Sequence, residues 1–172
     1  VLTDTGWREF QRWFVGEQCR PAVHDVRFQG AAEAAVAPTF AAALARADLA
    51  AVVICPSNPL LSVDPILAIP GVKQALAALT VPVIAVSPLV GGKAIKGPLA
   101  KMLTERGLGS DNAAIAAHYG ALVDHWLIDT VDEADAGVLR AAGHTVTVTP
   151  TVMRAAADRM ALARAVIAMA GI

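Results

Sequence analysis

The sequence has few of the features that mark a metal-held, disulfide-linked or membrane-spanning protein. Only two cysteines occur among the 172 residues, Cys19 and Cys55, and no second cysteine lies at the spacing of a metal-ligand pair or a CxxC motif. We expect both to be buried free thiols in a reducing cytoplasm. No run of about 18 apolar residues is free of charges, prolines and turn signals, so the sequence predicts no membrane-spanning segment.

The sequence also lacks an excess of charge of either sign. The formal net charge is −1, with 14 basic and 15 acidic residues interspersed along the chain. A hydrophobic share of 56% and a mean hydropathy of +0.54 reflect abundant alanine more than long apolar runs. Because no strong field surrounds such a chain, we predict neither a nucleic-acid nor a membrane partner. The sequence starts without methionine and without a signal-peptide pattern, and we expect residues to precede Val1.

Several motifs that carry well-known chemistry are absent. The sequence contains neither the GxGxxG turn nor the GxxxxGK[ST] loop that hold nucleotides in many α/β proteins. It lacks the GxSxG elbow of serine hydrolases, so no serine is predicted to act as a nucleophile. The four histidines are isolated in sequence, and we interpret them as core or surface residues: His24, His118, His125 and His144.

What the sequence does contain is an alternation of strand-like and helix-like segments. We predict strands at Val23 to Phe28, Ala51 to Cys55, Val81 to Ser87, His125 to Asp129 and His144 to Thr149. Helices are predicted at Pro38 to Ala47, Gly71 to Leu79, Pro98 to Arg106, Asp111 to Ala121 and Asp132 to Ala142. This alternation favours an α/β fold, a Rossmann-like three-layer sandwich with a mostly parallel sheet, built as a single domain over residues 1–172.

Large apolar residues at helical spacing predict one further helix at each end of the chain. The first, Leu2 to Val15, would carry the aromatic residues Trp7, Phe10, Trp13 and Phe14. The last, Val152 to Ala170, would carry Met153, Met160 and Ile167, each seven residues apart. We interpret both stripes as core packing; the alternative for the first is a flavin-like ring stacked on the tryptophans.

A rigid polar segment, Cys55-Pro56-Ser57-Asn58-Pro59, follows the second predicted strand. The two prolines fix their own φ angles and restrict the residues before them, so Ser57 and Asn58 are held in place. Polar groups at the carboxyl end of a strand are where open α/β sheets bind ligands, and Ser62 extends this set. The alternative is an ordinary turn in which Ser57 and Asn58 cap a helix.

A second polar loop, Ser87 to Pro98, follows the next predicted strand. Gly91 and Gly92 permit close approach of the backbone to a phosphate, and Lys93 and Lys96 add positive charge. The alternative is a surface turn with two solvated lysines. Because the two loops follow consecutive strands, we expect them to open onto the same sheet edge and to form one binding site.

Four acidic residues surround the fourth predicted strand: Asp124, Asp129, Asp132 and Asp135. Carboxylates grouped in this way are able to bind a metal ion. We favour a different interpretation, in which Asp132 caps the start of the following helix and the other carboxylates are solvated.

Taken together, the two loops resemble the signature segments of the 2-phospho-L-lactate transferase family. The resemblance rests on ICPSNPLLSVDPILAIPG (Ile54 to Gly71) and VSPLVGGKAIKGPLAKM (Val86 to Met102). It extends over the rest of the chain through FQRWFV (Phe10 to Val15), VRFQG (Val26 to Gly30), the Tyr119 to Asp129 segment, Met153 and Asp158-Arg159.

The resemblance implies a specific reaction. The family transfers a 2-phospholactyl group, or its phosphoenolpyruvyl counterpart, from a guanosine-diphosphate-linked donor to the deazaflavin FO, with Mg²⁺, in coenzyme F420 biosynthesis. It releases GMP. On this basis Ser57, Asn58 and Ser62 would face the donor diphosphate, and the loop with Gly91, Gly92, Lys93 and Lys96 would hold its phosphates. The resemblance further implies a cytoplasmic homodimer.

The sequence departs from the family pattern at its amino end. Family members begin with a strand and a GGTGG-like turn, followed by residues that the resemblance assigns to deazaflavin and metal binding. None of these is present, so the chain resembles the carboxyl-terminal portion, without the first strand of the family fold. We expect the catalytic residues and metal ligands to lie upstream of Val1.

Two other functions remain open from the sequence. One is a non-catalytic regulatory module of the same fold that binds a nucleotide or nucleotide-sugar. The other is an oligomerisation unit whose Trp7, Trp13 and Phe14 dock on a partner chain, since burial of aromatic rings supplies several kcal/mol at about 25 cal/mol per Å². The paired loops favour the transferase over both.

Overall fold

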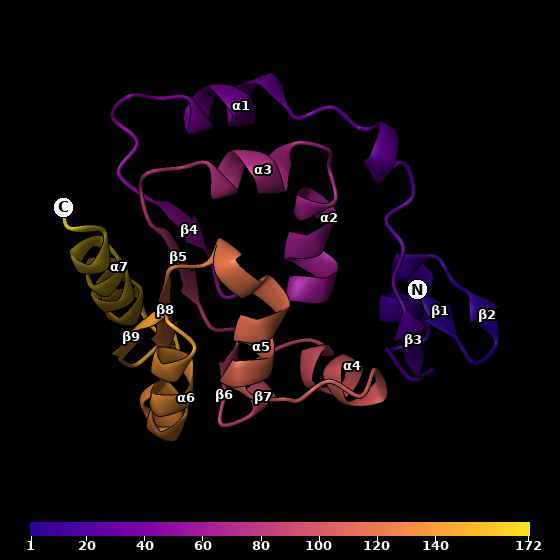
Figure 1. Ribbon diagram of the computed structural model, residues 1–172. Coiled ribbons are helices and arrows are strands. Elements are labelled where there is room, and N and C mark those ends of the chain that lie inside the picture. The colour runs from indigo at the N-terminus through magenta and orange to yellow at the C-terminus, as the bar shows by residue number, and fades with distance from the viewer.

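A four-stranded parallel sheet forms the centre of the computed structural model, which describes all residues from 1 to 172 (Figure 1). Its strands are β4 (Val52–Ile54), β5 (Val83–Val86), β8 (His125–Ile128) and β9 (Thr145–Val148), in the spatial order β4-β5-β8-β9. Every neighbouring pair is parallel. Four of the five predicted strands are therefore confirmed as members of one parallel sheet.

Helices cover both faces of this sheet, which confirms the predicted three-layer α/β fold. One face packs against α3 (Val72–Ala77), α4 (Leu99–Glu105), α5 (Asn112–Tyr119) and α6 (Ala136–Ala141) around a core of 22 buried residues. The other face packs against α7 (Ala156–Ala170), where Leu162 contacts a small cluster formed by Ile84, Val86 and Leu127. Alternate residues of β5 belong to the two cores, as the period-two geometry of a strand requires.

Shorter elements connect these layers. The helix α1 (Pro38–Leu44) precedes β4, and a π-helical turn (Pro59–Val63) followed by α2 (Asp64–Leu67) lies between β4 and α3. An antiparallel hairpin of β6 (Leu89–Val90) and β7 (Lys93–Ala94) follows β5. Three-residue 3₁₀ turns lie at Ala31–Glu33 and Gly120–Leu122.

The amino-terminal segment is not the predicted helix. Residues Leu2–Thr3 (β1) and Gly6–Trp7 (β2) form an antiparallel hairpin instead. The Thr3 hydroxyl donates to the Gly6 carbonyl at 2.9 Å, and Gly6 has φ +96°, which an α-helix cannot accommodate. Only residues 10–16 are helical, and Arg12–Gly16 within them form a π-helical turn.

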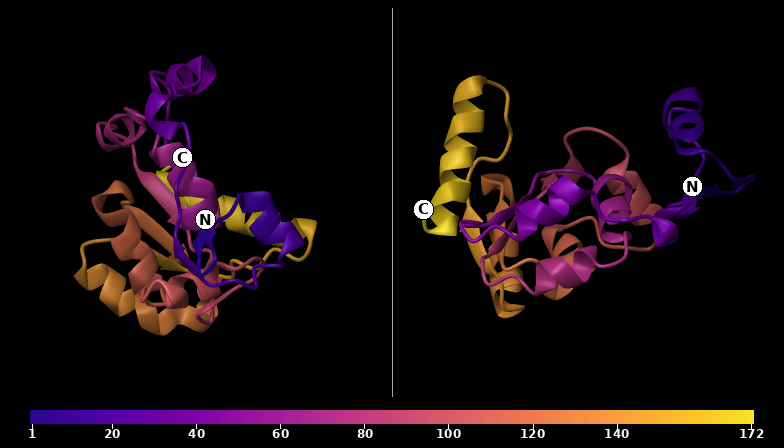
Figure 2. Two further views of the ribbon diagram at one scale, coloured as in Figure 1. Left: turned by 90° about the vertical axis from the view of Figure 1, so that its right-hand side faces the viewer. Right: turned by 90° about the horizontal axis from the view of Figure 1, so that it is seen from above.

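The first predicted strand belongs to this amino-terminal unit and not to the parallel sheet. It is shorter than predicted, as β3 (Val23–Asp25), and pairs antiparallel with β1 in a sheet of order β2-β1-β3. We call residues 1–25 the N-terminal β-module. Figures 1 and 2 show it at the opposite end of the molecule from α7.

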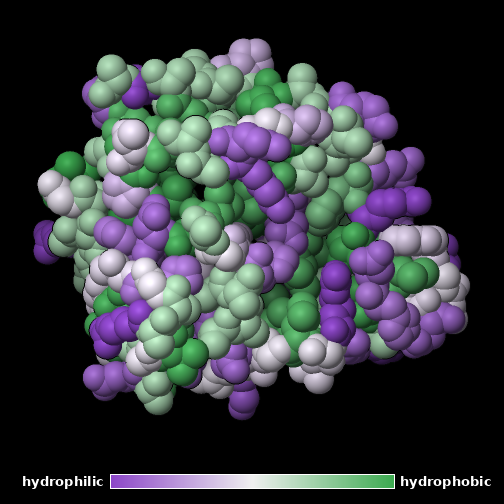
Figure 3. All heavy atoms as spheres, in the orientation of Figure 1, coloured by the Kyte–Doolittle hydropathy of each residue, from purple (hydrophilic) through white to green (hydrophobic).

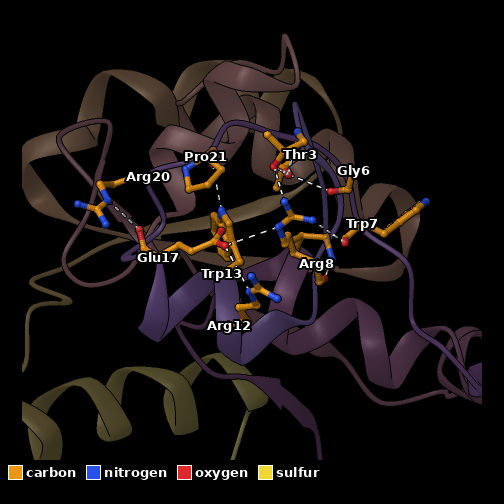
Figure 4. Close-up of polar contacts among 11 residues, drawn as sticks. Thr3, Gly6, Trp7, Arg8, Arg12, Trp13, Glu17, Arg20 and Pro21 are labelled. Atoms are coloured by element: carbon orange, nitrogen blue, oxygen red, sulfur yellow. Dashed lines mark hydrogen bonds and ion pairs between the residues drawn. The ribbon is translucent and has the colours of Figure 1, made fainter.

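The aromatic stripe of the N-terminal β-module is only partly core. Trp13 is fully buried and its indole N–H donates to the Pro21 carbonyl at 3.0 Å (Figure 4). Trp7, Phe10 and Phe14 are exposed by more than a third, and the rings of Phe10 and Phe14 stack at 5.2 Å. The module therefore has one buried aromatic anchor and leaves the rest of the stripe at the surface.

Hydrogen bonds to α4 fasten the N-terminal β-module to the rest of the chain. The Glu105 carboxylate accepts from the Val23 N–H at 2.9 Å, and Lys101 donates to the Pro21 carbonyl at 3.1 Å. Lys101 and Glu105 also form an ion pair with each other. Trp13 and Val23 belong to the main core cluster, so packing supplements these polar contacts.

The carboxyl-terminal helix is shorter than predicted, and its methionine stripe is not core. It begins at Ala156 because the Asp158 carboxylate accepts the N–H groups of Arg154 and Ala155 at 2.8 and 2.7 Å. Met160 and Ile167 are 55% and 47% exposed, whereas Leu162 is buried. The helix is rich in alanine on all sides, so large residues at a seven-residue spacing did not mark the buried face.

The apolar surface of the molecule is divided into small patches. Figure 3 shows pale-green alanine-like surface interrupted by hydrophilic side chains on the visible face, consistent with alanine as the source of the high hydropathy. Neither cysteine is buried as predicted: Cys55 is exposed and Cys19 is half-buried. No helix combines the length and apolar character that crossing a bilayer requires.

Candidate functional site

A cavity of about 250 Å³ lies at the carboxyl ends of the parallel strands. Segments that follow β4, β5 and β9 all contribute to it. Such a position is the usual ligand site of open α/β sheets, because the loops after parallel strands meet at one edge. We call it the sheet-edge pocket.

The loop after β4 contributes Pro56 and Asn58 to this pocket. The Asn58 amide oxygen accepts the backbone N–H groups of Leu60 and Leu61 at 3.0 and 3.2 Å, so it caps the following helical turn. Its amide nitrogen lies 3.9 Å from the Met102 sulfur. The cap thus fixes the side chain and leaves the N–H₂ group as the part able to serve a ligand.

The loop after β5 forms the opposite wall through the β6–β7 hairpin and the segment leading into α4. Ser87 is buried, and its hydroxyl accepts from the Leu89 N–H at 3.1 Å, which sets the turn out of β5. Gly91 and Gly92 follow with φ +61° and +69°. A Cβ at Gly92 would come within 3.2 Å of the Ser110 carbonyl, so both conformation and space require glycine there.

Two of the seven residues predicted for donor binding line the sheet-edge pocket, namely Asn58 and Lys96. The other five, Ser57, Ser62, Gly91, Gly92 and Lys93, belong to the same loops but are not among the residues that line it. Lys96 is exposed and forms no ion pair with a carboxylate. It is the one cationic side chain of the pocket wall.

The third wall was not predicted. Thr151, Val152 and Met153, which follow β9, complete the pocket. Only Met153 among them contributed to the family resemblance, but all three follow the last parallel strand, as the other two loops follow theirs. The rule that carboxyl strand ends share one edge would have found them.

Asp129 is buried rather than solvated, which corrects the sequence interpretation. Its carboxylate accepts the Thr151 N–H at 2.7 Å, the Thr151 hydroxyl at 3.1 Å and the Val131 N–H at 3.2 Å. Burial alone raises the pKa of this carboxyl, but the hydrogen bonds from Thr151, Val131 and Thr130 outweigh it and hold the pKa below the ordinary value. Asp129 is therefore an anion that ties β8 to the segment after β9.

Asp132 is not the helix cap that the sequence suggested. Its φ of −105° interrupts the 3₁₀ segment Thr130–Asp135, and α6 starts four residues later at Ala136. Asp132 is 7% exposed, and its two carboxylate oxygens accept the Gly91 N–H at 2.9 and 3.0 Å. The Gly91 N–H is thus already occupied by a protein acceptor.

These contacts bear on the expected magnesium ion. No group of three or more His, Cys, Asp or Glu side chains in the chain is arranged to hold a metal. Mg²⁺ usually takes one or two carboxylates together with substrate phosphates. The buried carboxylates that bond to the pocket-forming loops, Asp129 and Asp132, already accept protein hydrogen bonds, so this chain's residues do not fit a magnesium site there.

The histidines lie outside the sheet-edge pocket. His118 pairs with Asp64 at 2.9 Å, His24 pairs with Asp4 at 2.5 Å, and His144 lies 3.0 Å from the Val123 carbonyl. The pocket wall contains no His, Cys, Asp or Glu at all. It offers one cation, amide and hydroxyl groups and apolar surface, which suits binding of an anionic ligand and supplies no general base.

A larger cavity, of about 500 Å³, lies beside the N-terminal β-module. Trp7, Phe10, Arg27 and Phe28 line it, and the Arg27 guanidinium stacks over the Trp7 ring at 4.7 Å. Of the segments that follow the parallel strands, only the one after β4 reaches this cavity, through Leu61 and Pro65. Val1 also forms part of its wall. Size alone therefore does not make it the better candidate, and we take the sheet-edge pocket as the candidate ligand site.

Comparison with known proteins identifies the relatives of this chain. The family model described as 2-phospho-L-lactate transferase CofD matches residues 1–167. A phosphoenolpyruvate transferase of Streptomyces griseus is 36% identical over 162 residues, which cover 94% of this chain and 50% of that protein. A phosphoenolpyruvate transferase of Mycobacterium avium is 40% identical over 131 residues, covering 73% of this chain and 38% of its own length.

This chain spans about half the length of the Streptomyces griseus relative, or less in other matches. The family match nonetheless extends over nearly all of the chain, from the N-terminal β-module through most of α7. The loops after β4 and β5 that build the sheet-edge pocket lie within the matched region. This chain belongs to the 2-phospho-L-lactate transferase CofD family.

Proposed function

We propose that this protein is a transferase of coenzyme F420 biosynthesis that moves a phosphoenolpyruvyl or 2-phospholactyl group from a guanosine-diphosphate-linked donor to FO. The observation that carries the proposal is that the CPSNP and GGKAIKGP loops line one pocket at the carboxyl edge of the sheet, in a chain of this family. The relatives named phosphoenolpyruvate transferases favour the phosphoenolpyruvyl donor.

In the proposed reaction, a hydroxyl oxygen of FO forms a bond to the phosphorus that carries the three-carbon acid. The P–O bond to the GMP portion breaks, GMP leaves, and the hydroxyl releases its proton. In such transfers the protein acts mainly by positioning the donor and neutralising its charge. Lys96 would neutralise the diphosphate, the Asn58 N–H₂ group would donate to it, and the rigid turns after β4 and β5 would hold both in place.

Mg²⁺ is part of the proposal as the ion that offsets the negative charge of the donor phosphates. The residues of the sheet-edge pocket do not supply its ligands, so no step is assigned to it. We further propose that the enzyme acts in the cytoplasm as a homodimer. Exposed Trp7, Phe10 and Phe14 support an association surface on the N-terminal β-module, and light scattering of the purified chain tests the stoichiometry.

The reaction is tested by incubating a longer protein, which includes the residues expected upstream of Val1, with a guanosine-diphosphate-linked phosphoenolpyruvate donor, FO and Mg²⁺, and detecting the products by mass spectrometry. We expect dehydro-F420-0 and GMP in equal amounts, and loss of both with Asn58→Ala. Donor consumption without a deazaflavin product would contradict the transfer.

A second candidate function is a non-catalytic module of the same fold that binds a nucleotide or nucleotide-sugar. The observation that favours it is the absence of any His, Cys, Asp or Glu side chain from the pocket wall. Binding of GDP together with no transfer to FO would support this alternative.

A further inference from the structure

Two of the three walls of the sheet-edge pocket, those after β5 and β9, are hydrogen-bonded to one short segment that does not itself line the pocket, and we call these contacts ties. This segment, Asp129 to Asp132, follows β8 directly. Its two end residues are buried acids, 5% and 7% exposed, and both carboxylates bond to backbone far away in sequence. A capping or solvated aspartate needs neither burial nor distant partners, so these contacts call for another explanation.

The first tie holds the wall that follows β5. Both oxygens of Asp132 accept the N–H of Gly91, which is 41 residues earlier in the chain. Gly91 is the tip of the β6–β7 hairpin, and the chain runs from there through Ala94 and Ile95 to Lys96 in the pocket wall. The Gly91 backbone is exposed, so water is able to replace the lost acceptor. Loss of this tie would therefore change the position of the hairpin more than the stability of the fold.

The second tie holds the wall that follows β9. Asp129 accepts both the N–H and the hydroxyl of Thr151, 22 residues later, and Thr151 begins the wall that continues to Met153. Hydrogen bonds to a charged acceptor contribute more than neutral ones, and two from one residue also fix its orientation. The two ties therefore act on two different walls of the same pocket.

We propose that Asp129 and Asp132 are positioning residues that set the separation of the two pocket walls, and thereby the affinity for the diphosphate of the guanosine-linked donor. The proposal rests on the proposed function for the identity of the ligand. Neither carboxylate contacts that ligand; each acts through the segment it holds, Asp132 on the hairpin with Lys96 and Asp129 on Thr151 to Met153.

Calorimetric titration of GDP with Mg²⁺ tests this role in single variants. We expect Asp132→Ala and Asp129→Ala to weaken GDP binding by about tenfold each, the scale of one charge-assisted hydrogen bond. Asp132→Asn keeps an oxygen that accepts the Gly91 N–H, so we expect it to restore affinity to within about threefold of the original chain. A merely destabilising role would lower the unfolding temperature of Asp132→Ala without changing the GDP affinity of its folded fraction.

Asp124 provides a matched control. Its carboxylate accepts the Val83 N–H at 2.9 Å, so it also ties β8 to β5, but at the amino edge of the sheet. We expect Asp124→Ala to lower the unfolding temperature and to leave GDP affinity within about twofold. Equal losses of affinity in Asp124→Ala and Asp132→Ala, or unchanged affinity in both Asp129→Ala and Asp132→Ala, would overturn the proposal.

A second readout separates failure of the inference from failure of the proposed function. If neither the original chain nor a longer protein with the residues expected upstream of Val1 binds GDP, the proposed donor is wrong, and amide hydrogen exchange then decides the positioning role without any ligand. Asp132→Ala should speed exchange at Gly91 and at the following hairpin residues, and Asp129→Ala should do so at Thr151. Unchanged exchange at both positions would contradict the two ties.

Discussion

The carboxyl edge of the parallel sheet and the N-terminal β-module are held together in different ways. At the sheet edge, buried carboxylates bond to backbone groups of neighbouring loops. In the N-terminal β-module, one buried tryptophan is surrounded by part-exposed contacts such as the Arg8 to Glu17 ion pair at 3.6 Å (Figure 4). Exposed ion pairs contribute little, so the module depends mainly on packing of Trp13 and on its hydrogen bonds to α4. The two regions should therefore respond separately to substitution.

The largest expected effect lies in the N-terminal β-module. Trp13→Ala removes a fully buried ring and its hydrogen bond to Pro21, and we expect a loss of about 3 to 5 kcal/mol in unfolding free energy. Urea unfolding measures this change. GDP affinity of the folded fraction should stay within about twofold, because the module does not line the sheet-edge pocket. A parallel loss of GDP binding by the folded protein would show that the regions are coupled.

A smaller effect on stability is expected at the hairpin of the sheet edge. Gly92→Val places a branched side chain at φ +69° and within 3.2 Å of the Ser110 carbonyl, so we expect a loss of about 1 to 3 kcal/mol and weaker GDP binding. Gly97→Val is the control, since Gly97 has φ +80° with open space around its Cβ position. If both variants bind GDP equally, the close approach at Gly92 has no role in the pocket.

The N-terminal β-module shows why part of the fold was predicted wrongly. The pattern of Trp7, Phe10, Trp13 and Phe14 fits a helix, but the Thr3 to Gly6 turn stops helix formation and starts a hairpin. Local turn chemistry therefore overrode hydrophobic spacing. The central strands were predicted correctly because their aliphatic runs are short, nearly continuous and separated by helix-like segments, as buried parallel strands require.

The parts of the site that depend on local sequence could be predicted. Two proline-bounded or glycine-containing loops after strands are visible in the sequence, and they do meet at one edge. The Thr151 wall and the ties from Asp129 and Asp132 depend on partners 22 and 41 residues away, and a single sequence does not reveal such pairings. The same limit explains why Asp132 was interpreted as a helix cap, since local spacing suggests only hydrogen-bond partners a few residues away.

The pH dependence of stability tests the buried carboxylate of Asp129 at the sheet edge. The pKa of Asp129 is lower in the folded than in the unfolded chain, so its contribution is complete above the unfolded pKa, about 4, and is lost as pH falls through the folded value. We expect unfolding temperature to be insensitive to Asp129 protonation from pH 7 to about pH 5 and to fall in stronger acid. Asp129→Asn should flatten this acid limb. An unchanged acid limb would contradict an anionic Asp129 at the sheet edge.

The central claim is that the loops after β4 and β5 form an anion-binding pocket in which Lys96, and not Lys93, faces the ligand. Calorimetric titration of GDP with Mg²⁺ into the original chain, Lys96→Ala and Lys93→Ala tests it most directly. We predict binding by the original chain, about tenfold weaker binding by Lys96→Ala, and a change within about twofold for Lys93→Ala. Equal affinities in all three, or a larger loss from Lys93→Ala, would contradict the account.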